Sequence, residues 1–522
     1  MTVRTIVHTS EYHDSVSLML VARELVKLPG VEDAAVVMAT EANKGLLKTS
    51  GLLSAEAEAA TPNDLVIAIK GEGELEAALA EAEQLLAKKA SAEESSQYRP
   101  KTLRSAVRSF PDANVCVVSV AGRYAADEAW EALRRGLHVL LFSDNVSLED
   151  EIDLKHYASD NGLLLMGPGA GTTILNGVAL GFANVVPDGP VGIVSAAGTG
   201  LQEVSTLLAK HGIGLTQGIG VGGRDLKEEV GGLMMLSALR ALQADPATKV
   251  IVLISKPPAE SVSQKVFKQV GQSQKPTVVC FMGSVPDLSG LKNAVAATTL
   301  QEAALLAAGR TGAELPDLDK ALDSEVAALR KLAAELRQDL TDGQRYLRGL
   351  YSGGTLCYET QVVLRQISEQ EVLSNAPLEA GSQLPDSNHS QGHSMIDLGE
   401  EEFTVGRPHP MIDNDLRIRR LLQEAADPEV AAILLDVVIG YGAHDDPASE
   451  LGPAVRNAKR IAADAGRSLP VLASITGTEQ DPQGLSRTRQ ALEAAEVLIF
   501  DSNATVARLA ALLVTDGSQE SR

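Results

Sequence analysis

Residues 190–212, PVGIVSAAGTGLQEVSTLLAKHG, decide the fold. A short run of β-branched residues passes through a Gly-Thr-Gly turn into an Ala/Leu-rich amphipathic stretch, which predicts a strand, a tight turn and a helix. Residues 349–364, GLYSGGTLCYETQVVL, show the same order. Units of this kind build open parallel sheets, so both segments favour an α/β fold.

Outward from these two segments, short apolar runs alternate with helical stretches along nearly the whole chain. A second pair of similar segments follows the two turns. ALRALQADPATKVIVLISKPP (238–258) and RRLLQEAADPEVAAILLDVVIGY (419–441) each contain an amphipathic helical stretch, then Ala-Asp-Pro, then an apolar strand. Two similarities in the same order predict two related, doubly wound domains in one chain.

Composition limits the classes of partner. The 522 residues suffice for three or four domains at about 150 residues each. A formal net charge of −23 and an aromatic content of 3% argue against general nucleic-acid binding, because the surface repels phosphate backbones and offers few stacking rings. An anionic ligand must therefore be held by a local device such as a helix N-terminus.

Cysteine usage and hydropathy limit the compartment. Cys116, Cys280 and Cys357 form no CxxC pair, which argues against a structural zinc site and against a disulfide framework. The N-terminal sequence lacks the long apolar segment of a signal peptide, and no apolar run reaches the roughly 18 residues of a membrane span. We expect a cytoplasmic protein that binds neither nucleic acid nor membrane.

The two Gly-Thr turns are the first candidate site. In each turn, glycines allow a tight bend and a threonine hydroxyl stands at the helix start, where free N–H groups and the positive dipole end face outward. With pseudo-symmetric packing, both helix starts would converge on one phosphate or carboxylate. The alternative is that each turn is only a helix cap. The candidate residues are Ser195, Gly198, Thr199, Gly200, Ser352, Gly353, Gly354 and Thr355.

An arginine beside a glycine-rich strand end is the second candidate. In GIGVGGRDL (218–226), Gly222 and Gly223 permit close approach of a ligand. Arg224 has the bidentate geometry that clamps a carboxylate or a phosphate. The alternative is an ion pair between Arg224 and Asp225 that closes the loop.

The segment VGRPHPMID (405–413) occupies the comparable place in the second half of the chain. Arg407 is a second candidate anion clamp there. His409 stands between two prolines and is a candidate general acid or base, or else an ordinary loop residue.

Three further polar residues follow predicted strands. Lys256 ends IVLISKPP, where the sites of parallel sheets open, and Thr476 and Thr478 lie in the turn TGTE. Ordinary turn chemistry is the alternative for each of them. The histidines show no metal-ligand spacing, so we expect no metal site. The phosphate-binding loop of nucleotide enzymes and a GxGxxG after the first strand are both missing.

The order of four motifs resembles the α-subunit superfamily of succinyl-CoA synthetases. These motifs are MGPGAGTTILNG (166–177), PVGIVSAAGTGLQEV (190–204), GIGVGGRDL (218–226) and ADPATKVIVLI (244–254). Within that superfamily, nearly the whole chain resembles the FdrA branch. The segments that carry this closer resemblance include residues 14–47, SDNVSLEDEI (143–152), GLYSGGTL (349–356), FTVGRPHPMID (403–413), LLDVVIGYGA (434–443) and TGTEQDP (476–482).

The resemblance implies a domain plan. A Rossmann-like CoA-binding-type domain would span residues 1–185, two flavodoxin-like ligase domains would span 186–312 and 344–522, and a connecting helix would span 313–343. In the synthetases, two helix N-termini cradle a phosphohistidine. The helix at Thr199 would match the α-type helix, and the helix at Thr355 would match the β-type helix. CoA is a candidate ligand on this ground.

The chain departs from the synthetase pattern in several places. Residues 284–295, SVPDLSGLKNAV, contain no histidine where the synthetases carry a phosphohistidine loop. Lys256 stands where they place a glutamate, and HTSEYHDSV (8–16) replaces their glycine-rich CoA loop. No segment resembles the ATP-grasp domain that phosphorylates the histidine. A complete ATP-dependent ligase cycle on this chain alone is therefore not expected.

The FdrA branch is associated with allantoin breakdown in purine catabolism. The resemblance implies an oxamate carbamoyltransferase that acts with companion subunits and phosphorolyses oxalurate to oxamate and carbamoyl phosphate. In that reaction the paired helix N-termini would hold phosphate, Arg224 or Arg407 would bind the substrate carboxylate, and His409 would protonate the leaving nitrogen.

Three hypotheses follow. The first is this carbamoyltransferase subunit, which uses phosphate or carbamoyl phosphate, needs companion chains and is a candidate homodimer. The second is a CoA-binding component of an acyl-CoA ligase. The third is a ligand-binding or scaffold subunit without chemistry of its own. Oxalurate, other ureido acids and acyl groups present similar carboxylates, so the sequence leaves the substrate open.

Overall fold

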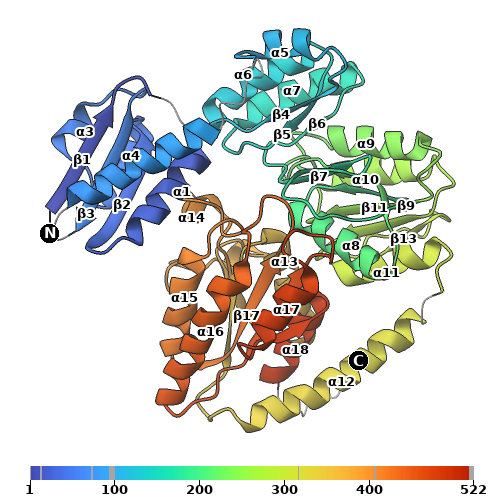
Figure 1. Ribbon diagram of the computed structural model, residues 1–522. Coiled ribbons are helices and arrows are strands. Elements are labelled where there is room, and N and C mark those ends of the chain that lie inside the picture. Colours follow the sequence, from blue (N-terminus) through green and yellow to red (C-terminus); the bar gives the residue numbers. More distant parts are fainter. Residues whose placement is uncertain are drawn as a thin grey trace. The chain divides into compact units, whose positions relative to one another are not determined.

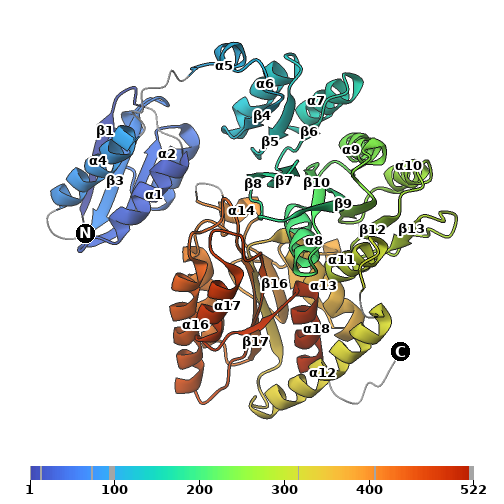
Figure 2. The same cartoon turned by 45° about the vertical axis from the view of Figure 1, so that its right-hand side comes forward.

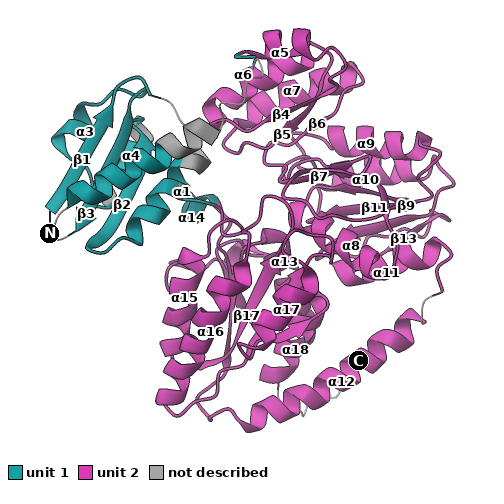
Figure 3. Ribbon diagram, viewed as in Figure 1, with its two compact units in different colours: residues 1–101, 401–408 teal, residues 102–400, 409–522 magenta. Residues whose placement is uncertain are grey.

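The computed structural model describes residues 2–11, 15–71, 75–92, 100–314, 317–368, 370–404 and 407–515 (Figure 1). The chain forms two compact units, coloured separately in Figure 3. Unit 1 comprises residues 1–101 with 401–408, and unit 2 comprises residues 102–400 with 409–522. Four sheets with helices packed on them make the α/β class that the sequence predicts.

Unit 1 is built on a three-stranded sheet in the order β1-β3-β2. Its strands are β1 (Thr2–His8), β2 (Val31–Met38) and β3 (Leu65–Gly71), and its helices are α1 (Ser15–Val26), α2 (Glu41–Thr49), α3 (Ala55–Ala59), α4 (Leu75–Ala92) and α14 (Glu401–Thr404). The expectation of a parallel sheet here is wrong, because β1 and β2 both run antiparallel to β3.

The central strand explains this error. Leu65, Ile67 and Ile69 of β3 are buried in one apolar cluster, and Val66 and Ala68 are buried in another, so both faces of the strand are covered. A strand covered on both faces carries a continuous apolar run whichever way its neighbours point. The run therefore predicted a buried strand correctly but not its direction.

Unit 2 begins with a small parallel sheet in the order β4-β5-β6. Its elements are α5 (Leu103–Ser109), β4 (Val115–Val118), α6 (Gly122–Leu133), β5 (His138–Leu141), α7 (Leu148–Asp160) and β6 (Leu165–Met166). The structure thus divides residues 1–185, expected as one Rossmann-like domain, among an antiparallel sheet in unit 1, this parallel sheet in unit 2 and the edge of the next sheet.

The first large sheet has the order β13-β12-β11-β9-β10-β7-β8. The strands β9 to β13 are parallel, and the hairpin β7–β8 adds an antiparallel edge. The strands are β7 (Thr172–Leu175), β8 (Val178–Gly181), β9 (Asp188–Ser195), β10 (Leu215–Gly220), β11 (Val250–Ser255), β12 (Thr277–Phe281) and β13 (Ala294–Ala296). The helices are α8 (Gly198–Lys210), α9 (Leu233–Ala244), α10 (Glu260–Val270) and α11 (Leu300–Arg310).

The second large sheet has the order β15-β16-β14-β17-β18-β19 and is parallel throughout. Its strands are β14 (Tyr346–Tyr351), β15 (Val372–Ser374), β16 (His393–Asp397), β17 (Val430–Val438), β18 (Val471–Thr476) and β19 (Leu498–Phe500). Its helices are α13 (Gly354–Ser368), the 3₁₀ turn Ala380–Ser382, α15 (Asp415–Ala426), α16 (Pro447–Asp464), α17 (Leu485–Glu493) and α18 (Asn503–Val514).

The two large sheets are wound alike. In each, the first of the parallel strands (β9 or β14) lies inside the sheet and leads into the helix with the Gly-Thr start (α8 or α13), and the last strand leads into α11 or α18. This order is the doubly wound, flavodoxin-like arrangement. The repeat seen in the sequence is therefore a repeat of topology.

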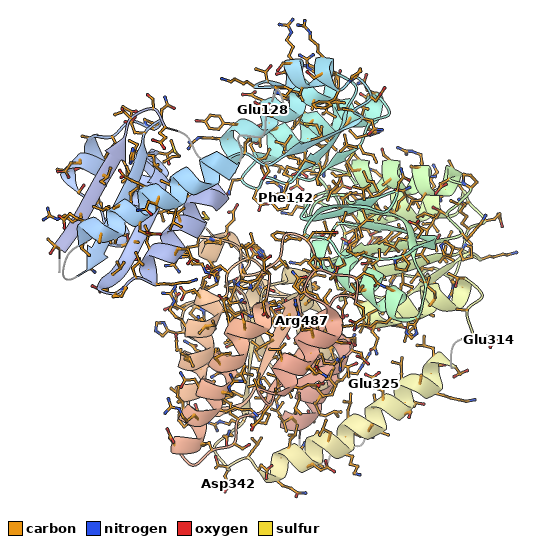
Figure 4. The ribbon with its side chains drawn as sticks, in the orientation of Figure 1. Glu128, Phe142, Glu314, Glu325, Asp342 and Arg487 are labelled. Atoms are coloured by element: carbon orange, nitrogen blue, oxygen red, sulfur yellow. The ribbon has the colours of Figure 1, made fainter. Side chains whose placement is uncertain are left out.

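Four helices join the two halves of unit 2. Figure 2 shows α8 and α11 of the first half beside α13 and α18 of the second, and residues from all four share one buried apolar cluster. The helix α12 (Leu318–Gln338) fills the stretch expected as a connecting helix and packs on α18. There Glu325, labelled in Figure 4, accepts a hydrogen bond of 2.7 Å from Thr505 and pairs with Arg508 at 3.2 Å.

Among the described residues, every helix is too short or too polar to cross a membrane.

Candidate functional site

The starts of α8 and α13 face each other across the boundary between the two halves of unit 2. A Cβ placed on Gly200 would lie 3.0 Å from Thr355 Cγ2, and one placed on Gly353 would lie 2.8 Å from Thr199 Cγ2. Each threonine methyl group thus packs against a glycine at the start of the opposite helix. The two Gly-Thr turns therefore converge, as pseudo-symmetric packing would require.

The convergence leaves hydrogen-bond donors at the junction. Residues in the first turn of a helix have no earlier carbonyl to accept their N–H groups. These are Gly198, Thr199 and Gly200 in α8, and Gly354 and Thr355 in α13. Within the described part of the chain, the two threonine hydroxyls make no hydrogen bond that would occupy them. Two positive dipole ends and two hydroxyls therefore lie at one junction.

A buried ion pair lies behind the start of α13. Both carboxylate oxygens of Asp436 accept hydrogen bonds, from the Ser352 N–H at 2.8 Å, the Gly353 N–H at 2.7 Å and the Ser352 hydroxyl at 3.0 Å. Arg417 of α15 pairs with the same carboxylate at 2.6 Å and also donates to the Leu350 carbonyl. This pair holds the turn and neutralises the charge of Asp436 beside the site.

The hydroxyl groups of both candidate serines form hydrogen bonds to other groups of the protein. The Ser195 hydroxyl accepts from the Ala197 N–H at 3.0 Å and donates to the Ala197 carbonyl at 2.7 Å, whereas the Ser352 hydroxyl donates to Asp436. They shape the two turns, so the donors that face the junction come from Thr199, Thr355 and the backbone.

A pair of buried glutamates reinforces the junction with the same two-fold pattern. Glu203 on α8 accepts the first N–H of α18, from Asn503, at 3.0 Å, and Glu359 on α13 accepts the first N–H of α11, from Leu300, at 2.6 Å. Both glutamates stand five residues after the first residue of their helix. Each helix that points at the site thus caps the last helix of the opposite half.

The buried carboxyl group of Glu359 is expected to make the free energy of unfolding depend on pH. Burial raises the pKa of this carboxyl from its ordinary value near 4.5 to about 7. The folded chain therefore keeps a proton that the unfolded chain releases, so this stabilisation is complete below about pH 4.5 and is lost as the pH rises through about 7. We expect a loss of about 3 kcal/mol across this window, and Glu359→Gln should remove it.

Urea unfolding followed by circular dichroism at pH 5 and pH 8 measures this difference. The exposed Glu335→Gln on α12 is the matched control, and it should keep the wild-type dependence. Equal pH slopes in Glu359→Gln and in wild type would show that Glu359 is charged throughout the window.

Two titratable side chains stand at the entrance of α13. Asp397 ends β16, is 4% exposed, and accepts the Gly399 N–H at 2.9 Å, while burial raises its pKa to about 7. His409 packs on Phe182 with ring centroids 5.5 Å apart, and burial lowers its pKa to about 4. The imidazole is therefore neutral near pH 7, so it has no extra proton to give as a general acid at that pH.

The two glycines expected after β10 and Lys256, expected at the end of β11, lie at the same edge of the sheet. Gly222 has a φ of +87°, and a Cβ there would meet the Pro168 carbonyl oxygen at 2.7 Å; a Cβ on Gly223 would lie 3.8 Å from the Ala196 carbonyl oxygen, next to the start of α8. Lys256 Nζ lies 5.1 Å from the centre of the Tyr358 ring on α13. An exposed cation thus stands at the side of the junction.

Arg224 has a different partner from the one considered in the sequence. Its Nε pairs with Glu151 of α7 at 2.7 Å and its NH2 donates to the Val146 carbonyl at 2.8 Å, whereas Asp225 pairs with buried Lys155. Arg224 therefore joins the small sheet to the large one, and its Nε and NH2 groups already have partners. As an anion clamp at the helix junction it is not supported.

Two of the remaining candidates have partners of their own, and the third belongs to unit 1. Thr476 donates to Glu203 at 2.5 Å, and Thr478 donates to the Val185 carbonyl at 2.7 Å, so both hydroxyls are structural. Arg407 is exposed and belongs to unit 1. The two arginines and two threonines had the right chemistry, but the fold commits three of them elsewhere.

Sequence reasoning missed the acidic residues of the site. Asp436 is the one charged residue of β17, which is buried at every position, and Asp397 ends the buried strand β16. A carboxylate in an apolar strand has to be paired or neutralised, so its presence is a usable signal. Arg417, Glu203 and Glu359 carry no comparable signal, because charged residues are ordinary in amphipathic helices.

Family comparisons match two separate parts of the chain. A model described as CoA-ligase matches residues 350–513, which include α13 and the strands around it. A model described as "AllF, heavy metal-associated domain" matches residues 1–101. Residues 350–513 are therefore similar to CoA-ligase domains, as the resemblance implied, and residues 1–101 are similar to the N-terminal domain of AllF.

Individual relatives match different shares of the chain. The chain is 44% identical over 99% of its length to "Uncharacterized protein YahF" of Escherichia coli K12, all of which it covers. It is 27% identical to the α-subunit of the ADP-forming succinate–CoA ligase of Methanothermobacter thermautotrophicus over 33% of this chain and 58% of that one. A solved acetyl-CoA synthetase of Candidatus Korarchaeum cryptofilum aligns with 77% of this chain and 82% of that chain, at 15% identity and a TM-score of 0.29.

The family model that matches residues 1–101 is described as a heavy metal-associated domain, so we asked whether these residues could hold a metal ion. Residues 1–101 contain no cysteine. Across the described ranges, no three His, Cys, Asp or Glu side chains are grouped so that they could hold a metal ion. The residues that the structure describes in unit 1 thus do not fit a heavy-metal site.

Proposed function

Because the chain belongs to the same family as the Escherichia coli protein YahF, and because its helices α8 and α13 begin face to face, we propose that it is the phosphate-binding subunit of an enzyme that transfers a carbamoyl or acyl group through phosphate. The specific reaction proposed is that of the FdrA branch, in which phosphate attacks the ureido carbonyl of oxalurate and releases oxamate and carbamoyl phosphate. Companion subunits complete the enzyme.

The convergence of the two helix starts carries this proposal. A phosphate between them would accept N–H groups from both first turns and hydroxyl groups from Thr199 and Thr355. Such donors are fixed before the ligand arrives, so they orient phosphate for attack without reorganisation. A chain with a net charge of −23 repels anions over most of its surface, which makes a local site of this kind necessary.

An acid–thiol ligase component is the second candidate. It is favoured by the CoA-ligase match over residues 350–513 and by the similarity to succinate–CoA ligase α-subunits. In that reaction the same junction would hold the phosphoryl group of an acyl phosphate. The loop after β12 contains no histidine to carry a phosphoryl group, so this role would need one from a companion subunit.

The double variant Thr199→Val, Thr355→Val tests the phosphate site. Valine keeps the shape of threonine and removes the hydroxyl, and a hydrogen bond to a charged group contributes about 1.5–3 kcal/mol. We expect inorganic phosphate to bind at least about tenfold more weakly, measured by isothermal titration calorimetry. Thr199→Ser, Thr355→Ser keeps both hydroxyls and is the control. Unchanged phosphate affinity in the valine variant would reject the site.

Turnover distinguishes the two candidates. The chain, assembled with its companion subunits, should form carbamoyl phosphate from oxalurate and phosphate without ATP. Formation of an acyl-CoA from an acid, CoA and ATP, with no reaction of oxalurate, would favour the ligase instead. Phosphate binding with neither activity, in the complete assembly, would favour a ligand-binding subunit.

A further inference from the structure

The carboxyl group of Asp397 reaches the first turn of α13 through a gap that a glycine leaves open. A Cβ placed on Gly354, the first residue of the helix, would lie 2.2 Å from Asp397 Oδ2. Oδ1 accepts the Gly399 N–H, but no group in the described ranges donates a hydrogen bond to Oδ2. A carboxyl that is 96% buried therefore presents one unpartnered oxygen at the entrance of the candidate phosphate site.

His409 stands next to this carboxyl. A Cβ placed on Gly399 would lie 2.8 Å from His409 Nε2, 3.1 Å from Asp397 Oδ1 and 3.1 Å from the Ser352 carbonyl oxygen. The Nδ1 atom accepts the Met411 N–H at 3.2 Å, which assigns the ring hydrogen of the neutral imidazole to Nε2. Both side chains therefore surround one small space, which residue 399 leaves open because it is glycine.

Three charged groups and two neutral groups surround Asp397. Glu400 and Asp436 act against its ionisation, and Lys256 at the end of β11 acts in favour of it. The thiol of Cys357 on α13 and the neutral ring of His409 complete the surroundings. Burial is the largest influence, and it leaves the carboxyl able to hold or release a proton near neutral pH.

We propose that Asp397 is the catalytic residue that carries the proton in the phosphate-dependent transfer, and that His409 donates a hydrogen bond from Nε2 to the bound anion or substrate. This inference rests on the proposed function. The acid–base role expected for His409 thereby passes to the carboxyl at the end of the buried strand β16.

The proton balance of the reaction needs one such group. As an oxygen of hydrogen phosphate forms its bond to the ureido carbon of oxalurate, ionised Asp397 accepts the phosphate proton. As the carbon–nitrogen bond breaks, the same proton passes to the leaving nitrogen, which becomes the amide of oxamate. Carbamoyl phosphate and oxamate are then released with no net proton taken up or lost, and Asp397 returns to its ionised form.

The variant Asp397→Asn, assembled with its companion subunits, tests this role. Asparagine has the same shape but cannot carry the proton, so we expect turnover of oxalurate to fall at least about 100-fold. Asp287→Asn, an exposed aspartate in the loop after β12, is the matched control and should keep wild-type turnover. Gly399→Ala is a second test, because its methyl group would separate Asp397 from His409 and should also lower turnover.

Binding of inorganic phosphate gives a readout that does not depend on turnover. Ionised Asp397 repels the anion. The phosphate affinity of wild type should therefore fall relative to that of Asp397→Asn as the pH rises from 6 to 8. Above the pKa of Asp397, this ratio should fall by at most roughly tenfold per pH unit. The titration of phosphate itself is common to both proteins and cancels in the ratio. Retained phosphate binding also shows that the variant is folded.

The outcomes separate the two proposals. Phosphate binding with an affinity ratio that does not change with pH, or wild-type turnover in Asp397→Asn, overturns the role of Asp397 and leaves the phosphate site standing. An inactive wild-type assembly that still shows the pH-dependent ratio overturns the proposed reaction and keeps Asp397 beside the anion. A wild-type chain that does not bind phosphate overturns both.

Discussion

Replacing Asp436 with alanine is expected to lower the free energy of unfolding of unit 2 by about 3–5 kcal/mol, because removal of one partner leaves a buried charge without compensation. Arg417 is 2% exposed and donates to Asp436 and to the Leu350 carbonyl. The Ser352 and Gly353 N–H groups would lose their acceptor as well. This is the largest stability effect that the site predicts.

Urea unfolding followed by circular dichroism measures this loss. Asp415→Ala on the same helix as Arg417 is the matched control, because Asp415 forms an ion pair with Arg419 whose side chains are 69% and 58% exposed. An exposed pair contributes about 0–1 kcal/mol, so the control should stay close to wild type. A loss below about 1 kcal/mol in Asp436→Ala would mean that the pair does not hold the start of α13.

The variant Gly353→Ala is expected to disturb the junction itself. Its methyl group would lie 2.8 Å from Thr199 Cγ2, 3.0 Å from Thr199 Oγ1 and 3.1 Å from Asp436 Oδ2. Either α8 and α13 move apart or Thr199 rotates, and both changes displace a donor. We expect a loss of about 1–3 kcal/mol in stability from overpacking and a clear loss of phosphate affinity.

Gly290→Ala is the control for this variant, since a Cβ on Gly290 would meet nothing within 4 Å. Thermal unfolding and phosphate calorimetry on the two alanine variants give the comparison. Wild-type stability and phosphate affinity in Gly353→Ala would show that the two helix starts are not packed against each other in solution.

The repeat in the chain made the centre of the fold predictable. A Gly-Thr turn between an apolar strand and an amphipathic helix occurs twice, and each is followed by a similar helix and strand, so local pattern and internal similarity pointed to the same pair of domains. In unit 1 the local pattern was just as clear, yet strand direction depends on how the chain returns to the sheet. An apolar run contains no information about that return.

Local sequence patterns could not predict the hydrogen-bond and ion-pair partners of the candidate polar residues. Thr476 ends a strand as a ligand-binding threonine would, but its hydroxyl is taken by Glu203, 273 residues away. Arg224 likewise pairs with Glu151, on a helix that precedes the whole large sheet. Hydrogen bonds of this kind depend on how elements distant in sequence pack together. A candidate polar residue is therefore available to a ligand only when no other group of the protein occupies its donors or acceptors.

The central claim is that α8 and α13 together hold one phosphate. A crystal structure of the chain grown at saturating inorganic phosphate tests it most directly. We expect a single anion at the junction that accepts hydrogen bonds from the N–H groups of Gly198–Gly200, Gly354 and Thr355 and contacts both threonine hydroxyls. Crystals in which phosphate is bound elsewhere, with the junction closed or filled only by water, would contradict it.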